Sequence, residues 1–188
     1  MAVGEIGFDK HIYGLTKYAD LKITDDYLIW QRVFLEAQLE LAVSFGRAVL
    51  IHNREAVEEL LDVLKSEKWD GKISRLVLHC CEPDDRLLDL AVAHDWFIGV
   101  DGDVTYSADK AEFISHVPLE RLVLETDAPY LLPEPERSLK KDVPFKDRVC
   151  EPQHVFLTAT KVANIKGVSL EKVAETTTPN AQRLLGIE

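Results

Sequence analysis

Five short apolar runs, each suited to a buried β-strand, occur in the first two thirds of this chain and constrain what it can fold into. The stretches between them have the periodicity of amphipathic helices. Uniformly apolar strands that alternate with helices are typical of a parallel sheet whose two faces are both covered. The sequence therefore predicts an α/β fold in the order strand, helix, strand. The five runs are Ala2 to Gly7, Ala48 to Ile51, Leu76 to Leu78, Trp96 to Val100 and Leu122 to Leu124.

The clearest predicted helix spans Tyr27 to Phe45, with Thr24 or Asp25 as its cap and Gly46 at its end. Its apolar residues recur at helical spacing, so we expect this stripe to face the core. After the last strand, the chain predicts a Pro-rich loop, one helix from Pro152 and two closing helices. The stripe comprises Trp30, Val33, Phe34, Ala37, Leu41 and Phe45; the loop is Ala128 to Cys150, and the closing helices are Ser169 to Thr176 and Pro179 to Leu185.

Polar side chains stand at the ends of four of the five strands. Glu5, His52, His79 and Asp127 each follow or end an apolar run. Because the carboxyl ends of parallel strands meet on one face of the fold, these side chains can come within reach of each other. Two imidazoles and two carboxylates suit a divalent metal ion such as Zn, Mn or Fe, or Mg with more waters. The pattern predicts a metal centre at the strand ends.

Composition limits the classes of protein that remain. The 188 residues suffice for one domain, which we expect to span residues 1–188. A net charge of −11 disfavours a protein that coats nucleic acid, although bound metal ions could still meet a phosphodiester. No apolar run could span a membrane, and no secretory signal is evident. With only three cysteines, two of them adjacent, we expect a cytoplasmic protein.

Six stretches together resemble the TatD-type deoxyribonucleases, a family of metal-dependent hydrolases with a (β/α)8 TIM barrel. The resemblance covers nearly all of the chain, and the fifth stretch is its most specific part. The stretches are GEIGFD (Gly4 to Asp9), QRVFLEAQLELA (Gln31 to Ala42), VLIHNREA (Val49 to Ala56), LHC (Leu78 to Cys80), PLERLVLETDAPY (Pro118 to Tyr130) and VAETTTPNAQRLLG (Val173 to Gly186).

This resemblance implies a TIM-barrel type fold that is represented by about its last five β/α units. The family begins with a strand ending in His-x-His, which this sequence lacks. The resemblance further implies one or two divalent ions (Mg, Mn or Zn), with Glu5 bridging them, His52 and His79 binding one, and Asp127 acting on the other side. Such a site cleaves the phosphodiester bonds of DNA with a metal-activated water, so Glu5 and Asp127 would be catalytic. Arg54 would contact the substrate phosphate, and a salt bridge is an equally open role for it.

Other interpretations remain open from the sequence. The chain alone could be weakly active or inactive, and serve as a binding module whose open sheet edge pairs with a second copy or with a partner that completes the barrel. It could also be an amidohydrolase-type enzyme acting on a small ester or amide. For Glu125 the sequence favours a structural ion pair at least as much as a catalytic role. Asp101 and Asp103 flank a glycine and fit a turn, and Cys80 fits a buried position as a small apolar residue.

Overall fold

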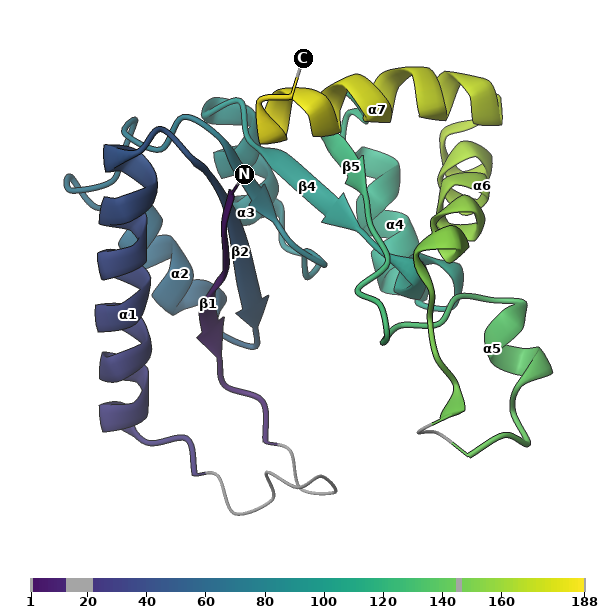
Figure 1. Cartoon of the computed structure of the whole chain (residues 1–188), viewed down its shortest axis with the longest axis horizontal. Coiled ribbons are helices and arrows are strands. Elements are labelled where there is room, and N and C mark those ends of the chain that lie inside the picture. The colour runs from purple at the N-terminus through teal and green to yellow at the C-terminus, as the bar shows by residue number, and fades with distance from the viewer. Residues whose placement is uncertain (1, 13–21, 145–146, 188) are drawn as a thin grey trace.

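Five parallel strands form one sheet whose strand order is the order of the chain (Figure 1). The computed structural model describes residues 2–12, 22–144 and 147–187. Every neighbouring pair of strands is parallel, which confirms the expected sheet. The strands are β1 (Ala2–Asp9), β2 (Ala48–Arg54), β3 (Leu76–Leu78), β4 (Phe97–Val100) and β5 (Leu122–Leu124).

A helix follows each of the first four strands, and three helices follow the last one, so the predicted alternation is confirmed. Short 3-10 turns lie between some of these elements. The helices are α1 (Asp25–Ser44), α2 (Val57–Leu64), α3 (Asp85–Ala93), α4 (Ala108–His116), α5 (Glu136–Leu139), α6 (Val155–Lys166) and α7 (Leu170–Leu185); the 3-10 turns are η1 (Gly102–Thr105), η2 (Leu119–Arg121) and η4 (Pro152–His154).

The two faces of the sheet bury their side chains against different elements. Successive strand residues point to opposite faces, and the larger apolar core joins one face to the surrounding helices. The other face, called the inner face below, carries a smaller core to which α7 contributes. Figure 1 shows α7 crossing the end of the sheet where the strands begin. The inner-face core consists of Ala48, Val77, Phe97, Val123 and Leu184.

Helix α1 begins and ends close to the predicted positions. The Thr24 hydroxyl accepts a hydrogen bond from the Tyr27 backbone N–H at 3.3 Å, so Thr24 is the cap and Asp25 the first helical residue. Gly46, just beyond the end of the helix, has a φ of 56°, a left-handed value that glycine adopts at little cost. Local sequence signals therefore define both ends of this helix.

The predicted core stripe of α1 is wrong. Leu35, Leu39 and Ala42 are buried against the sheet, whereas the stripe residues point outward. The helix carries apolar residues on two opposite sides, and its periodicity cannot tell which side the sheet covers. The exposed fractions are 60% for Trp30, 49% for Val33, 61% for Phe34, 53% for Leu41 and 69% for Phe45, and Ala37 is also exposed.

The two predicted closing helices form one continuous helix, α7. Pro179 lies inside it, where the missing N–H removes one helical hydrogen bond. The next residue compensates through tertiary contacts. The buried Asn180 amide donates to the backbone carbonyl of Leu119 at 3.1 Å and of Leu122 at 2.8 Å. These two bonds attach α7 to the start of β5 and keep the helix intact.

The Pro-rich segment after β5 contains the one-turn helix α5 and otherwise has little regular structure over its described residues. Two of its residues, 145 and 146, lie outside the described part of the chain. Across the described residues, no helix combines the length and apolar character that crossing a membrane requires.

The attachment of α7 gives the first prediction. Asn180→Ala should lower the free energy of unfolding by about 1–3 kcal/mol, because two buried carbonyls lose their donor. Denaturant titration followed by circular dichroism measures this loss. Asn164→Ala, at an exposed position on α6, is the matched control and should change stability by less than about 0.5 kcal/mol. Equal effects from the two variants would contradict the role assigned to Asn180.

Candidate metal centre

Alternation along the strands places several polar side chains on the inner face. His52 lies four residues beyond Ala48, and His79 lies two beyond Val77. Glu125 and Asp127 lie two and four residues beyond Val123. In β2, β3 and β5 an inner-face apolar residue is therefore followed, at or just beyond the carboxyl end of the strand, by a polar residue. The resulting polar patch lies at the opposite end of the sheet from α7.

Three of the predicted residues come together at this end. His79 Nε2 lies 3.4 Å from Glu5 Oε1 and 3.4 Å from Asp127 Oδ1. One ligand atom from each of the three residues falls within 4.8 Å of the other two. They come from β1, from the residue after β3 and from the segment after β5, which are distant in sequence. A ring nitrogen with two carboxylate oxygens is a donor set that suits Zn or Mn, or Mg with additional waters.

A β-bulge directs Glu5 toward this cluster. Val3 pairs with Val49 and Ile6 pairs with Ile51, so two residues of β1, Gly4 and Glu5, oppose a single residue of β2. Gly4 packs so tightly on Leu50 that an added Cβ would stand 2.5 Å from the Leu50 Cβ. Bulges are often found where a strand must redirect a side chain next to a site. Glu5 remains 46% exposed and so can reach a ligand in solution.

Glu125 has a more specific role than the sequence indicated. One of its carboxylate oxygens bonds His79 Nδ1, and the other accepts the Cys80 N–H at 2.8 Å. This pairing turns His79 Nε2 toward Glu5 and Asp127. Gly99 on β4 leaves the necessary room, because a Cβ there would lie 2.0 Å from Glu125 Oε1. A carboxylate on the distal nitrogen is the usual way in which proteins orient a metal-binding histidine.

The carboxylates around His79 also set its charge. Burial by itself lowers the pKa of this imidazole, but hydrogen bonds to Asp127 and Glu125 and the charge of Glu5 outweigh burial and raise the pKa to about 10. Without a metal ion the ring therefore holds a second proton at neutral pH. A divalent cation would replace that proton as the positive charge among three carboxylates.

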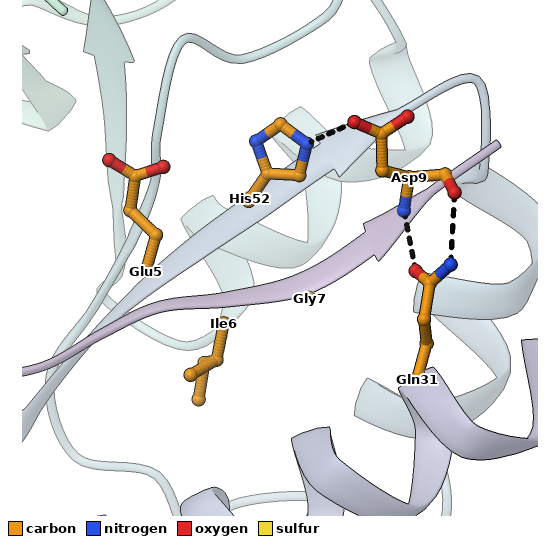
Figure 2. A pocket seen from close by; sticks show the side chains of 6 residues that line it. All are labelled: Glu5, Ile6, Gly7, Asp9, Gln31 and His52. Atoms are coloured by element: carbon orange, nitrogen blue, oxygen red, sulfur yellow. Dashed lines mark hydrogen bonds and ion pairs between the residues drawn. The ribbon is translucent and has the colours of Figure 1, made fainter. Parts of the chain in front are cut away.

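His52 lies near the cluster and has a different partner. Its Nε2 is 3.3 Å from Asp9 Oδ2, and Figure 2 shows its ring on the same side of the sheet as Glu5. Asp9 is held in turn by Gln31 of α1, whose side-chain amide bonds both the N–H and the carbonyl of Asp9. These residues line one open cleft together with Gly7 and Ile6. The sequence predicted His52 but assigned no role to Asp9 or Gln31.

Arg54 ends β2 and pairs in register with Asp9 of β1, two residues beyond His52. This position is at the same end of the sheet as the cluster. Its side chain is half-buried. The contact between Arg54 and the substrate therefore remains a prediction.

A buried lysine supports the turn that carries His79. The Lys110 ammonium donates to the carbonyls of Cys80 at 3.1 Å and Cys81 at 2.7 Å. It also lies 3.3 Å from Asp103 and 3.8 Å from Asp101. Asp101 accepts the Asp103 N–H at 2.7 Å, as expected for a turn, but its burial behind the site was not expected. Lys110 occupies an inward position on α4, and no sequence signal distinguished it from a surface lysine.

Cys80 lies beside the cluster, next to His79 and Glu125. Its sulfur could join His79 and Glu125 geometrically. However, burial and the charges of Glu125 and Asp101 raise the pKa of the thiol well above its usual range. The metal-free thiol therefore keeps its proton, which a metal ion would have to displace in order to bind the sulfur. Cys80 is half-buried, so the expected packing role is met only in part.

Comparisons with known proteins identify the family of the chain. The family described as TatD related DNase matches residues 1–186. A protein from Mycobacterium tuberculosis named as metal-dependent hydrolase TatD is 32% identical over 190 residues, covering 100% of this chain and 65% of that protein. The 3'-5' ssDNA/RNA exonuclease TatD of Escherichia coli is 32% identical over 163 residues, covering 84% of this chain and 58% of the exonuclease.

A solved structure shows the same fold. The TatD homologue YJJV of Escherichia coli superposes with a TM-score of 0.78 at 24% identity, covering 100% of this chain and 64% of that one. Its fold is a TIM barrel, so the parallel sheet of five strands is an α/β structure of the (β/α)8 barrel type. The chain spans somewhat less than two thirds of the length of the relatives named here.

The pairing of His79 with Glu125 predicts a pH-dependent property of the metal-free protein. Glu125→Gln should lower the pKa of His79 from about 10 toward its ordinary value of 6.5, because a neutral amide stabilises the imidazolium less well. NMR titration of labelled histidine measures this pKa directly. A pKa that does not change would contradict the pairing.

The same pKa has a consequence for stability. A raised folded-state pKa stabilises the fold fully below the unfolded value of 6.5, and this stabilisation is lost as pH rises toward 10. The free energy of unfolding of the metal-free wild type should therefore fall between pH 6.5 and 10. The decline should be shallower in Glu125→Gln, and denaturant titrations across this range compare the two proteins.

Removing the buried lysine should destabilise the fold strongly. Lys110→Met leaves Asp101 and Asp103 without their cation and should lower the free energy of unfolding by about 3–5 kcal/mol. Lys65→Met, at an exposed position after α2, is the control and should be close to neutral. A loss below about 1 kcal/mol for Lys110→Met would show that the two carboxylates find other compensation.

Proposed function

This chain belongs to the TatD-related DNase family, and from that premise we propose that it is a metal-dependent hydrolase of phosphodiester bonds in DNA. The observation that carries the proposal is the meeting of Glu5, His79 and Asp127 within 4.8 Å, with Glu125 orienting the histidine. The naming of one relative as an ssDNA/RNA exonuclease supports a nucleic-acid substrate. Mg, Mn and Zn are all compatible with the donor set.

The metal would be held by Glu5, His79 and Asp127, with His52 as a further ligand from the adjoining cleft. A bound divalent ion would act as a Lewis acid that neutralises phosphate charge and lowers the pKa of the attacking water. Glu5 is the most exposed of these side chains and sits between the cluster and the cleft, which suits a carboxylate shared between two ions. One or two ions can therefore be accommodated by the proposed residues.

Asp127 is the proposed proton acceptor. Its carboxylate is 28% exposed, so water can approach it while it still contacts His79. Its φ of 52° is left-handed, a conformation that aspartate tolerates better than most residues. The local backbone thus presents the carboxylate at the start of an irregular segment. Asp127 would take a proton from the attacking water, as a general base does.

Arg54 is the proposed phosphate contact. A guanidinium binds phosphate oxygens through paired donors, and Arg54 ends the strand that carries His52. The chain as a whole has a net charge of −11, so it repels a polyanion. Attraction of DNA would then depend on the few cationic groups at the site, namely the metal and Arg54. Because so few phosphate contacts are involved, binding should weaken only modestly as salt rises.

A mutant pair tests the catalytic assignment. Asp127→Asn should reduce hydrolysis of an end-labelled single-stranded oligonucleotide by about 10²- to 10⁴-fold, because the amide cannot accept the proton. Asp89→Asn, an exposed change on α3, is the control and should leave the rate unchanged. Turnover by Asp127→Asn at the wild-type rate would remove Asp127 from the mechanism.

Metal removal gives an independent test. Chelation of the purified protein should abolish hydrolysis, and Mn, Mg or Zn should restore it. Elemental analysis should find bound metal in the wild type and less of it in His79→Ala. Metal retained at wild-type levels by His79→Ala would contradict the proposed donor set, whatever the activity.

The acidic surface favours one second candidate, hydrolysis of a small ester or amide. A net charge of −11 disfavours a polyanion more than a small neutral substrate. Parallel assays on bis(4-nitrophenyl) phosphate and 4-nitrophenyl acetate separate the two candidates. Metal-dependent turnover of the acetate alone would favour the small-substrate enzyme.

A further inference from the structure

We propose that Tyr130 and Arg137 form a subsite for an unpaired nucleic-acid strand beside the metal centre, in which Tyr130 stacks on a base and Arg137 binds a backbone phosphate. The subsite would extend the proposed function, on which it rests, from the scissile bond to the neighbouring nucleotides. Both residues belong to the segment after β5, and Tyr106, which follows η1, supports Arg137.

This subsite lies at the end of the sheet that carries the metal centre. Tyr130 comes three residues after Asp127, and its N–H donates to the Asp127 carbonyl at 2.8 Å. Such a turn brings the two Cα atoms within about 7 Å of each other. Tyr106 follows the carboxyl end of β4, the strand that pairs with β5. Figure 1 shows α5, which carries Arg137, at the opposite end of the sheet from α7.

Contacts with η1 fix the course of the segment between the two side chains. The Leu131 carbonyl lies against Gly102, where an added Cβ would stand 2.2 Å from its oxygen. The Glu134 N–H donates to the Thr105 hydroxyl at 2.8 Å. The segment therefore follows η1 from its first residue to its last, and Arg137 lies just beyond it.

Arg137 is a cation that is held in place without a carboxylate partner. Its guanidinium lies over the Tyr106 ring, 4.2 Å from the ring centroid. Stacking occupies one face of the guanidinium and leaves the N–H groups along its edge able to bind phosphate oxygens. Within the described part of the chain, no hydrogen bond or ion pair engages these N–H groups. Arg137 is therefore oriented for a phosphate that the protein itself does not replace.

Five other arginines of this acidic chain are engaged by oxygen atoms of the protein. Three pair with carboxylates and two donate to backbone carbonyls, namely Arg32, Arg86 and Arg121, and Arg75 and Arg148. A net charge of −11 repels a polyanion, so an arginine with an open edge at the site has a large relative effect. Arg137 would add a further cation to the metal and Arg54.

Tyr130 is an exposed aromatic residue on a fixed backbone. Its side chain is 64% exposed, although its own N–H is bonded and the preceding carbonyl, that of Pro129, accepts the N–H of the buried Cys150 at 3.0 Å. A base can stack on such a ring without ordering the backbone first, and any base will serve because each has a π-face. Stacking requires an unpaired base, so this residue would favour a single strand over a duplex.

Fluorescence anisotropy of a labelled oligothymidylate measures strand binding by the full chain. A chelator is present, so that no strand is cut during the measurement. Titrations at several salt concentrations give both the affinity and the slope of log Kd against log salt. For single strands this slope changes by about 0.7 for each phosphate contact.

Arg137→Gln should weaken binding about tenfold and reduce the salt slope by about 0.7, because one charged phosphate contact is lost. Tyr106→Phe keeps the supporting ring and should bind like the wild type, whereas Tyr106→Leu should resemble Arg137→Gln and add little to it. Arg183→Gln is the matched control. Arg183 is also exposed and stacked, 4.9 Å from the Phe97 ring, but it lies on α7 at the other end of the sheet, so affinity and slope should not change.

Tyr130→Ala should weaken binding by about 5- to 150-fold, as the loss of one stacked base does, and should leave the salt slope unchanged. The same variant should bind an abasic strand as the wild type does, because such a strand has no base to stack. Phe45→Ala is the control, since Phe45 is 69% exposed and lies near the start of β2, away from the site. It should bind both strands normally.

Three results would overturn the subsite. An unchanged affinity and salt slope in Arg137→Gln would show that the stack on Tyr106 only holds α5 in place. Equal losses on the normal and abasic strands in Tyr130→Ala would show that the ring supports the fold and does not stack on a base. Absence of strand binding by the wild type would do the same for the whole subsite. Because binding is read without turnover, a failure to hydrolyse DNA would count against the proposed function alone.

Discussion

Parallel pairing of consecutive strands is the constraint on which the rest of this structure depends. Because all five strands run in the same direction, their carboxyl ends meet at one end of the sheet. Because successive residues alternate between faces, the same strands can bury valine and phenylalanine at one end and present histidine and carboxylates at the other. The inner-face core and the candidate metal centre therefore lie at opposite ends of the same strands.

The candidate centre is held by groups that would not themselves touch a metal. Glu125 orients His79, and Gly99 leaves the space that Glu125 needs. Lys110 holds the carbonyls of the following turn from inside the core. In a buried site, partly satisfied polar groups are costly, so these contacts restrict the histidine to one orientation. Glu5 of β1 and the partly exposed Asp127 of the segment after β5 then face the same nitrogen.

Helix α1 differs from the candidate centre, because its own structure is well formed but one of its apolar sides is not packed against other residues. Its cap, its end and its inner side are all well formed. Its outer side is apolar and faces solvent, next to a strand edge without a partner in the described chain. The hydrophobic effect disfavours such a surface in water.

The sequence by itself determined the order of strands and helices, the parallel sheet and the residues at the strand ends, because periodicity and residue type are local properties. It also placed Glu5, His79 and Asp127 at one end of the sheet. Only the tertiary structure decided that His52 sits with Asp9, that Glu125 orients His79, and that Lys110 is buried. It likewise decided which side of α1 is covered. Helical periodicity in the sequence shows that a side of a helix is apolar. Which element packs against that side depends on contacts with residues that are distant in the sequence.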